Sequence, residues 1–141
     1  MAVPWLAGPV PMRGRYHGGS LPADCCTMTV SIALEFGVIT ELIHAHALEN
    51  PGQRALVEDG RTLDYAALDH AMDRVAGALQ REGLLPGDAI AICAGMSIDY
   101  GVVFLGALRA GVVVAPLAPG SGAASLRRMV QDARACRVFV D

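Results

Sequence analysis

Short apolar runs that favour β-structure alternate with helical stripes through the second half of the chain, and this alternation most restricts the fold. The first run, Ala89 to Cys93, is apolar at every position, as expected of a strand buried on both faces. The pattern then predicts a helix from Ser97 to about Ala110, a strand from Val112 to Leu117, a helix carrying Leu126, Met129, Val130 and Ala133, and a last strand from Arg137 to Val140. Successive β-α-β units with short connections require a parallel sheet with right-handed crossovers and helices on its faces. We therefore predict an α/β fold.

The first half predicts a helix and a hairpin ahead of that sheet. We expect Thr40 to cap a helix that stops at Asn50-Pro51-Gly52. Arg54 to Glu58 and Arg61 to Leu63 flank Asp59-Gly60, a dipeptide favoured in tight hairpin turns. These runs therefore predict a small antiparallel hairpin.

A long amphipathic helix is expected after the hairpin. Asp64 can cap a helix from Tyr65 to about Arg81, which Gly83 ends. The apolar residues of this segment repeat at the spacing of one buried stripe, so Asp69 and Asp73 are expected on the solvent side. None of these carboxylates is paired in a way that suggests a general acid and base.

The residues ahead of this domain differ in composition. Residues 1 to 38 mix glycine, proline and isolated hydrophobic residues without a helical or strand period, and we interpret them as an unstructured leader. Met28 opens a more regular segment, and we expect it to be the natural start of the protein. The predicted domain covers residues 39 to 141.

Composition excludes several kinds of chemistry. The chain carries 11 basic and 14 acidic side chains, and every basic one is arginine, because no lysine occurs. Schiff-base catalysis and a phosphate loop of the Walker type both need a lysine and have no candidate residue here. The net charge of -3 gives no electrostatic reason to expect nucleic acid as a partner.

The hydrophobic content of 53% is high for 141 residues. Because a short chain has a large surface for its volume, we expect part of its apolar surface to meet a partner segment, or to cause self-association. The longest apolar run, Tyr100 to Leu117, is interrupted by Arg109 and falls short of the roughly 20 residues of a membrane-spanning helix. The first residues lack a signal-peptide pattern and the cysteines lack metal-ligand spacing, so we expect free thiols and a cytoplasmic location.

Two stretches resemble the first core motifs of the AMP-forming adenylating enzymes. They are Leu105 to Leu117 (LGALRAGVVVAPL) and Thr62 to Leu68 (TLDYAAL), with Pro86-Gly87-Asp88 at a similar spacing between them. The resemblance extends from about Glu41 to Asp141. It implies that residues 39 to 141 are an N-terminal portion of the AMP-binding domain of this family, within its α/β large domain.

The resemblance also implies a reaction for the complete enzyme. That reaction is ATP-dependent activation of a carboxylate to an acyl-adenylate, followed by transfer to coenzyme A or to a carrier thiol. ATP, magnesium and coenzyme A are the implied cofactors, and a small carboxylate is the implied substrate. Among family members we favour an acyl-CoA synthetase of fatty acid metabolism over a peptide-synthetase domain.

The family's phosphate loop, ribose-binding aspartate and catalytic lysine belong to segments beyond Asp141. The residues present therefore supply scaffold. We expect no catalytic, cofactor-binding or metal-binding residue among them, and no adenylating activity from this chain by itself.

Two other interpretations stay open. The first is a non-enzymatic remnant, or interaction module, that keeps the same scaffold. The second is a small dinucleotide-binding domain of the Rossmann type, because Gly120 and Gly122 open a helix after a strand and Asp141 ends the next strand about 20 residues later. Ser125 weakens this second interpretation, since it stands where the fingerprint needs a third glycine or alanine.

His44 and His46 are the histidines nearest to a metal-binding pair. Residues two apart on a helix point about 200° from each other, so these side chains cannot share an ion. We expect both to be surface or partly packed histidines.

Overall fold

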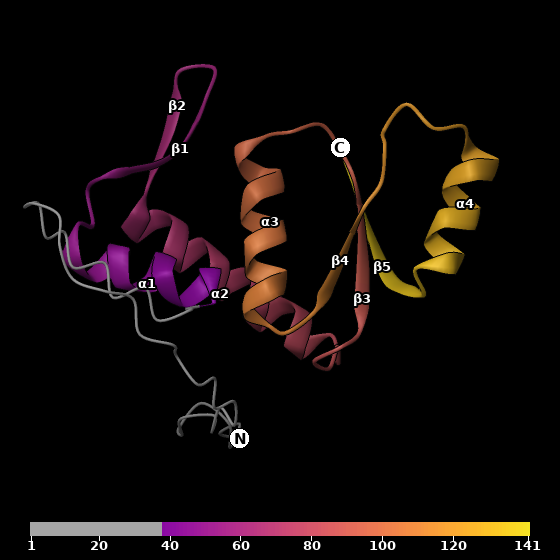
Figure 1. Ribbon diagram of the computed structural model, residues 1–141, viewed down its shortest axis with the longest axis horizontal. Helices are drawn as coiled ribbons and strands as arrows, with labels where there is room; N and C mark the ends of the chain where they lie inside the picture. Colours follow the sequence, from indigo (N-terminus) through magenta and orange to yellow (C-terminus); the bar gives the residue numbers. More distant parts are fainter. Residues whose placement is uncertain (1–37) are drawn as a thin grey trace, which may run out of the picture. The chain divides into compact units, whose positions relative to one another are not determined.

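The computed structural model describes residues 38–141, so the expected leader and the start at Met28 lie outside the described residues. The described chain alternates helices and strands and confirms the α/β class (Figure 1). In chain order the elements are α1 (Ile39–Glu49), β1 (Arg54–Glu58), β2 (Arg61–Asp64), α2 (Tyr65–Arg81), β3 (Ala89–Cys93), α3 (Ile98–Arg109), β4 (Val113–Pro116), α4 (Ala123–Asp132) and β5 (Ala135–Val140).

The hairpin of β1 and β2 is antiparallel, as predicted, and turns at Asp59 and Gly60. Both turn residues have positive φ angles, 43° and 82°, which is the backbone that a tight hairpin turn needs. The predicted cap of α1 was wrong: the N-cap is Val38, two residues before Thr40, and no side chain caps the helix. Thr40 instead lies buried inside the first turn.

Both ends of α2 agree with the sequence prediction. The Asp64 carboxylate accepts a hydrogen bond from the Ala67 backbone N–H at 2.8 Å, which caps the helix start. Gly83 follows the helix with a φ angle of 85°, a left-handed conformation that favours glycine. Local signals therefore determine where this helix begins and ends.

The three-stranded sheet is parallel and has the order β4-β3-β5. Its central strand is buried from Ile90 to Cys93. Ile90 and Ile92 pack into one cluster with residues of α2 and α3, including Leu79 and Ala107. Figure 1 shows α3 and α4 on opposite sides of this sheet, as expected because the right-handed crossovers β3-α3-β4 and β4-α4-β5 run in opposite directions across the sheet.

Helix α3 packs against both the sheet and α2. Ser97 caps it by accepting a hydrogen bond from the Tyr100 backbone N–H at 3.0 Å. Gly106 is buried where the helix meets Val75 of α2, so the glycine permits the two helices to approach closely.

The other side of the sheet is less well covered. No residue of α4 is buried, although the helix carries the predicted apolar stripe. Val113, Val138 and Val140 on the outer strands are 52%, 46% and 72% exposed. Cys136 is also exposed, because within residues 38–141 β5 is an edge strand paired with β3 alone.

Among residues 38–141, no helix has both the length and the apolar character needed to cross a membrane.

Candidate functional site

Two cavities lie beside the first turn of α3, and Ser97 lines both of them. The first, of about 310 Å³, also contains Ile92 of β3 and Phe139 of β5. It therefore lies at the carboxyl ends of the neighbouring parallel strands β3 and β5. Open parallel sheets bind ligands preferentially at this position.

The walls of this first cavity are mostly apolar. Tyr100 and Phe139 supply aromatic rings, and Asp99 and Asp141 supply carboxylates. The Asp141 carboxylate already accepts a hydrogen bond from the Gly95 backbone N–H at 2.8 Å, which ties the end of β5 to the turn after β3. Among the described residues, no basic side chain lines this cavity, so its walls offer no cation that would attract an anion.

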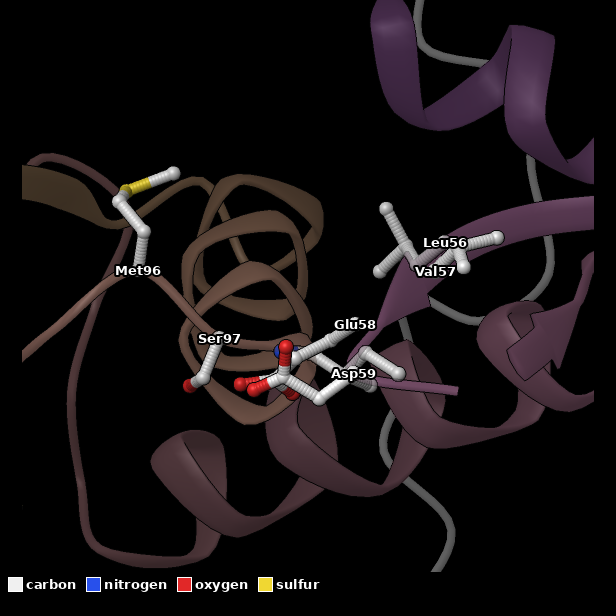
Figure 2. Close-up of a pocket in the computed structure, with 7 residues that line it drawn as sticks. Leu56, Val57, Glu58, Asp59, Met96 and Ser97 are labelled. Carbon is white, nitrogen blue, oxygen red and sulfur yellow. The ribbon is translucent and has the colours of Figure 1, made fainter. Parts of the chain in front are cut away.

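The second cavity, of about 470 Å³, lies between the β1-β2 hairpin and the start of α3. Figure 2 shows the carboxylates of Glu58 and Asp59 gathered near Ser97, with Met96 to one side. The Glu58 carboxylate accepts a hydrogen bond from the Ile98 backbone N–H at 2.9 Å. Protein side chains therefore already occupy the first N–H groups of α3, which elsewhere in proteins can hold a phosphate.

Charge at this second cavity is mainly negative. Arg61 lies 3.8 Å from Glu58 and 3.7 Å from Asp99, so its guanidinium already has carboxylate partners. Ser97 uses its hydroxyl oxygen to cap the helix. In the described part of the chain, neither cavity thus presents an activated nucleophile, or the donors that a triphosphate needs.

An ion-pair cluster lies deeper, where α1, α2 and α3 meet. The Arg109 guanidinium donates to the carboxylates of Asp69 and Asp73 and to the backbone carbonyls of Thr40 and Asp69. His44 Nδ1 lies 3.0 Å from the other oxygen of Asp69. Asp69 is 8% exposed, which corrects its expected place on the solvent side of α2.

Burial alone would raise the pKa of Asp69, but the hydrogen bonds from Arg109 and His44 outweigh it and hold the pKa of this carboxyl below its usual value. The carboxylate is therefore charged and engaged by both partners. This arrangement ties three helices together, which is a structural role rather than a catalytic one.

The sequence analysis missed Arg109 as a partner of α2. A signal was present, because a single cation in an otherwise apolar helix needs an anion when it is buried. Asp69 and Asp73 are four residues apart and share one face of α2, so they were candidates for that anion.

The structure does not bring the dinucleotide-fingerprint residues together. Gly120 and Gly122 follow β4, whereas Asp141 follows β5, and β3 separates these strands. The fingerprint requires its acidic residue on the strand next to the glycine loop. The carboxylate of Asp141 binds Gly95 instead, so this alternative loses its geometric basis.

The histidines have separate partners, as their spacing on α1 predicted. His44 pairs with Asp69, and the ring of His46 lies 5.0 Å from the ring of Tyr65. Across residues 38–141, no three His, Cys, Asp or Glu residues are grouped so that they could hold a metal ion.

Comparison with known proteins shows which protein family this chain is related to. The family model for AMP-binding enzymes matches residues 43–141. The polyketide synthase PksN of Bacillus subtilis is 33% identical over 101 residues, which cover 72% of this chain and 2% of that protein. The fatty acid–[acyl-carrier-protein] ligase ScoC of Streptomyces coeruleorubidus is 31% identical over 96 residues, which cover 68% of this chain and 18% of the ligase.

A solved structure agrees in fold. The N-terminal subdomain of NpsA from Klebsiella oxytoca, in complex with 3-hydroxyanthranilyl-AMSN, superposes with a TM-score of 0.68 at 23% identity. The match covers 73% of this chain and 26% of the NpsA chain. The present chain therefore spans only a small part of the proteins that it matches.

Proposed function

Because this chain belongs to the family of AMP-binding enzymes, we propose that it supplies the scaffold of an adenylating enzyme. The complete reaction joins a carboxylate to the AMP portion of ATP, with release of pyrophosphate, and then passes the acyl group to a thiol. The observation that carries the proposal is the family match over residues 43–141. The chain's own residues would build the parallel sheet and pack α2 and α3 against it.

ATP does not fit the described residues as a ligand. A triphosphate needs converging donors or cations. Here Glu58 and Ser97 already cap α3, carboxylates line both cavities, and the chain contains no lysine. We therefore derive no catalytic step from these residues, and we propose that the nucleotide and magnesium contacts of the reaction belong to other parts of an adenylating enzyme.

Coenzyme A is the thiol that we propose as acyl acceptor, with a fatty acid as the carboxylate. A carrier-protein thiol is the second candidate, and the likeness to ScoC favours it, because that enzyme is named as a ligase of fatty acids and acyl-carrier protein. We propose a cytoplasmic location, since Cys93 and Cys136 are both free thiols and disulfides are rare in a reducing compartment.

A non-catalytic interaction module is a further candidate. The exposed valines of β4 and β5 and the poorly buried α4 favour it, because a parallel sheet is normally covered on both faces.

A chimera tests the scaffold proposal. Residues 43–141 would replace the matched segment of ScoC, and fatty-acid-dependent exchange of pyrophosphate into ATP would be measured. We expect exchange above background from the chimera and none from the chain alone. A matched chimera carrying Gly106→Leu, which separates α2 from α3, should lose the exchange. A folded chimera without exchange would contradict the proposal and favour the interaction module.

A further inference from the structure

The outer edge of β5 is open to a further strand. Within residues 38–141 the six residues of β5 pair only with β3, so the backbone groups on the other side of β5 have no strand partner. β4 is the other outer strand, but it has four residues and ends at Pro116, which has no backbone N–H to donate. β5 contains no proline. A strand can therefore add to this sheet at β5 more readily than at β4.

The two faces of β5 have different surroundings. Arg137 donates a hydrogen bond to the residue that ends α2, and Phe139 packs against the core cluster, so both side chains lie on the face toward α2 and α3. Side chains alternate along a strand, which places Val138 and Val140 on the opposite face. These valines are exposed, so the face that they share is free to meet a partner.

Arg137 and Asp141 are four residues apart on the same face of this strand, and each keeps a free group. The Arg137 guanidinium donates from Nε to Glu82 and from Nη1 to the Cys136 carbonyl, and within the described residues Nη2 has no partner. The Asp141 carboxylate uses Oδ2 to accept from the Gly95 N–H, and its other oxygen has no hydrogen bond in the same part of the chain. The edge therefore presents a cation and an anion that can each take a further partner.

We propose that two copies of this chain pair antiparallel through β5, about a two-fold axis at Phe139 and perpendicular to the sheet. This register places Val138 of each copy opposite Val140 of the other. It also places Arg137 of each copy opposite Asp141 of the other, so two ion pairs form by symmetry. An axis at Val138 would instead place Arg137 opposite Phe139 and form no ion pair. Charge complementarity therefore selects the first register.

A second copy fits this edge because the edge is complementary to itself. The paired sheet would have six strands, with both α3 helices on one face. A single strand edge buries less surface than the roughly 1,200 Å² of a stable interface, so the dimer should dissociate on dilution. Isologous pairing uses the β5 edge of both copies, so association should stop at two. This inference does not depend on the adenylating function.

Sedimentation equilibrium of the full chain in reducing buffer tests the proposal. We expect a dimer fraction that rises across about a hundredfold range of concentration. Arg137→Glu and Asp141→Arg each place like charges opposite one another, and each should raise the dissociation constant about tenfold or more. Arg128→Glu, at an exposed position of α4, is the matched control and should leave the dimer unchanged. Equal weakening by the control, a wild-type monomer at every concentration, or species larger than a dimer would overturn the proposal.

Mixing the two charge reversals tests the register. A pair of one Arg137→Glu chain and one Asp141→Arg chain again has opposite charges at both positions, so the mixture should form a heterodimer although each variant alone is weakened. Two variants that are folded by circular dichroism but do not associate on mixing would contradict the axis at Phe139.

A milder variant covers the case in which a charge reversal does not fold. Asp141→Asn keeps an oxygen that can accept from the Gly95 N–H and removes only the charge. It should also weaken the dimer. An unchanged dissociation constant in this variant would contradict the ion pair with Arg137.

Discussion

A Cβ atom added at Gly106 of α3 would lie 2.6 Å from the Cβ of Val75 on α2. That separation is shorter than two carbon atoms tolerate, so this contact sets how closely the two helices pack. α2 and α3 together cover one face of the sheet, and the core cluster around Ile90 and Ile92 depends on their spacing. The glycine is therefore a packing requirement of the whole domain.

Gly106→Ala should destabilise the protein by about 1 to 3 kcal/mol, because the added methyl group forces the helices apart. Gly77→Ala is the matched control: its added Cβ would meet only the flexible end of Arg81, at 3.2 Å. Alanine has the higher helix propensity, so this control should be neutral or stabilising. Urea unfolding of both variants measures the difference, and equal stability would contradict the packing argument.

Arg109→Met should destabilise the protein by about 3 kcal/mol, because the substitution leaves the buried carboxylate of Asp69 without its main partner. The side chains of Arg109 and Asp69 are only 16% and 12% exposed, so water cannot replace the lost hydrogen bonds. Arg127→Met, at an exposed position of α4, should change the free energy of unfolding by less than about 0.5 kcal/mol. Similar losses in both variants would show that Arg109 is not specially required.

Asp69 should make stability fall in acid. Its pKa is lowered in the folded protein, so its contribution is fully present above the unfolded pKa of about 3.9 and is lost as the pH falls through the folded value. The stability gap between wild type and Asp69→Asn should therefore narrow between about pH 5 and pH 2. Thermal unfolding across this range, with Asp132→Asn as a charge control, checks the effect. A constant gap would contradict the lowered pKa.

Ser97→Ala should cost about 1 kcal/mol of stability, because the Tyr100 N–H loses its hydrogen-bond acceptor at the start of α3. Ser125→Ala replaces an exposed serine within α4 and should be neutral. Urea unfolding gives both values. If Ser97→Ala were also neutral, Glu58 alone would be sufficient to cap the helix.

The chain should self-associate through the valines of its β5 edge. Val138 and Val140 lie on a strand at the edge of the described sheet and are 46% and 72% exposed. Val138→Lys with Val140→Lys should reduce light scattering, since charged side chains block edge pairing. Val57→Lys, at a valine on the hairpin that is 63% exposed, is the control. A monodisperse monomer for the wild-type chain would contradict this prediction.

The helices and strands could be predicted from the sequence because their signals are local. Asp64 and Gly83 delimit α2, and Asp59-Gly60 turns the hairpin, each through the conformation of a few neighbouring residues. The predicted start of α1 was wrong by two residues, since Val38 precedes the helix without a capping side chain and gives no local signal.

The candidate site depends on contacts between residues that are far apart in the sequence, and most of these contacts were not predicted. Glu58 reaches Ile98 across 40 positions, and Arg109 reaches Asp69 across the same separation. The strand order also could not be predicted, because β-α-β units alone do not say on which side of β3 the last strand adds. These pairings follow from tertiary packing rather than from local pattern.

The central place of β3 also has a consequence for the order of folding. β3 is the first strand of its sheet in the chain, and its pairing with β5 joins residues such as Gly95 and Asp141, which are 46 positions apart. β4 is closer in sequence and closes a shorter loop, at a lower entropic cost. We therefore expect the β3-α3-β4 unit to form the nucleus, with β5 joining last and opening first. Among the three strands of this sheet, amide hydrogen exchange would then be fastest at β5.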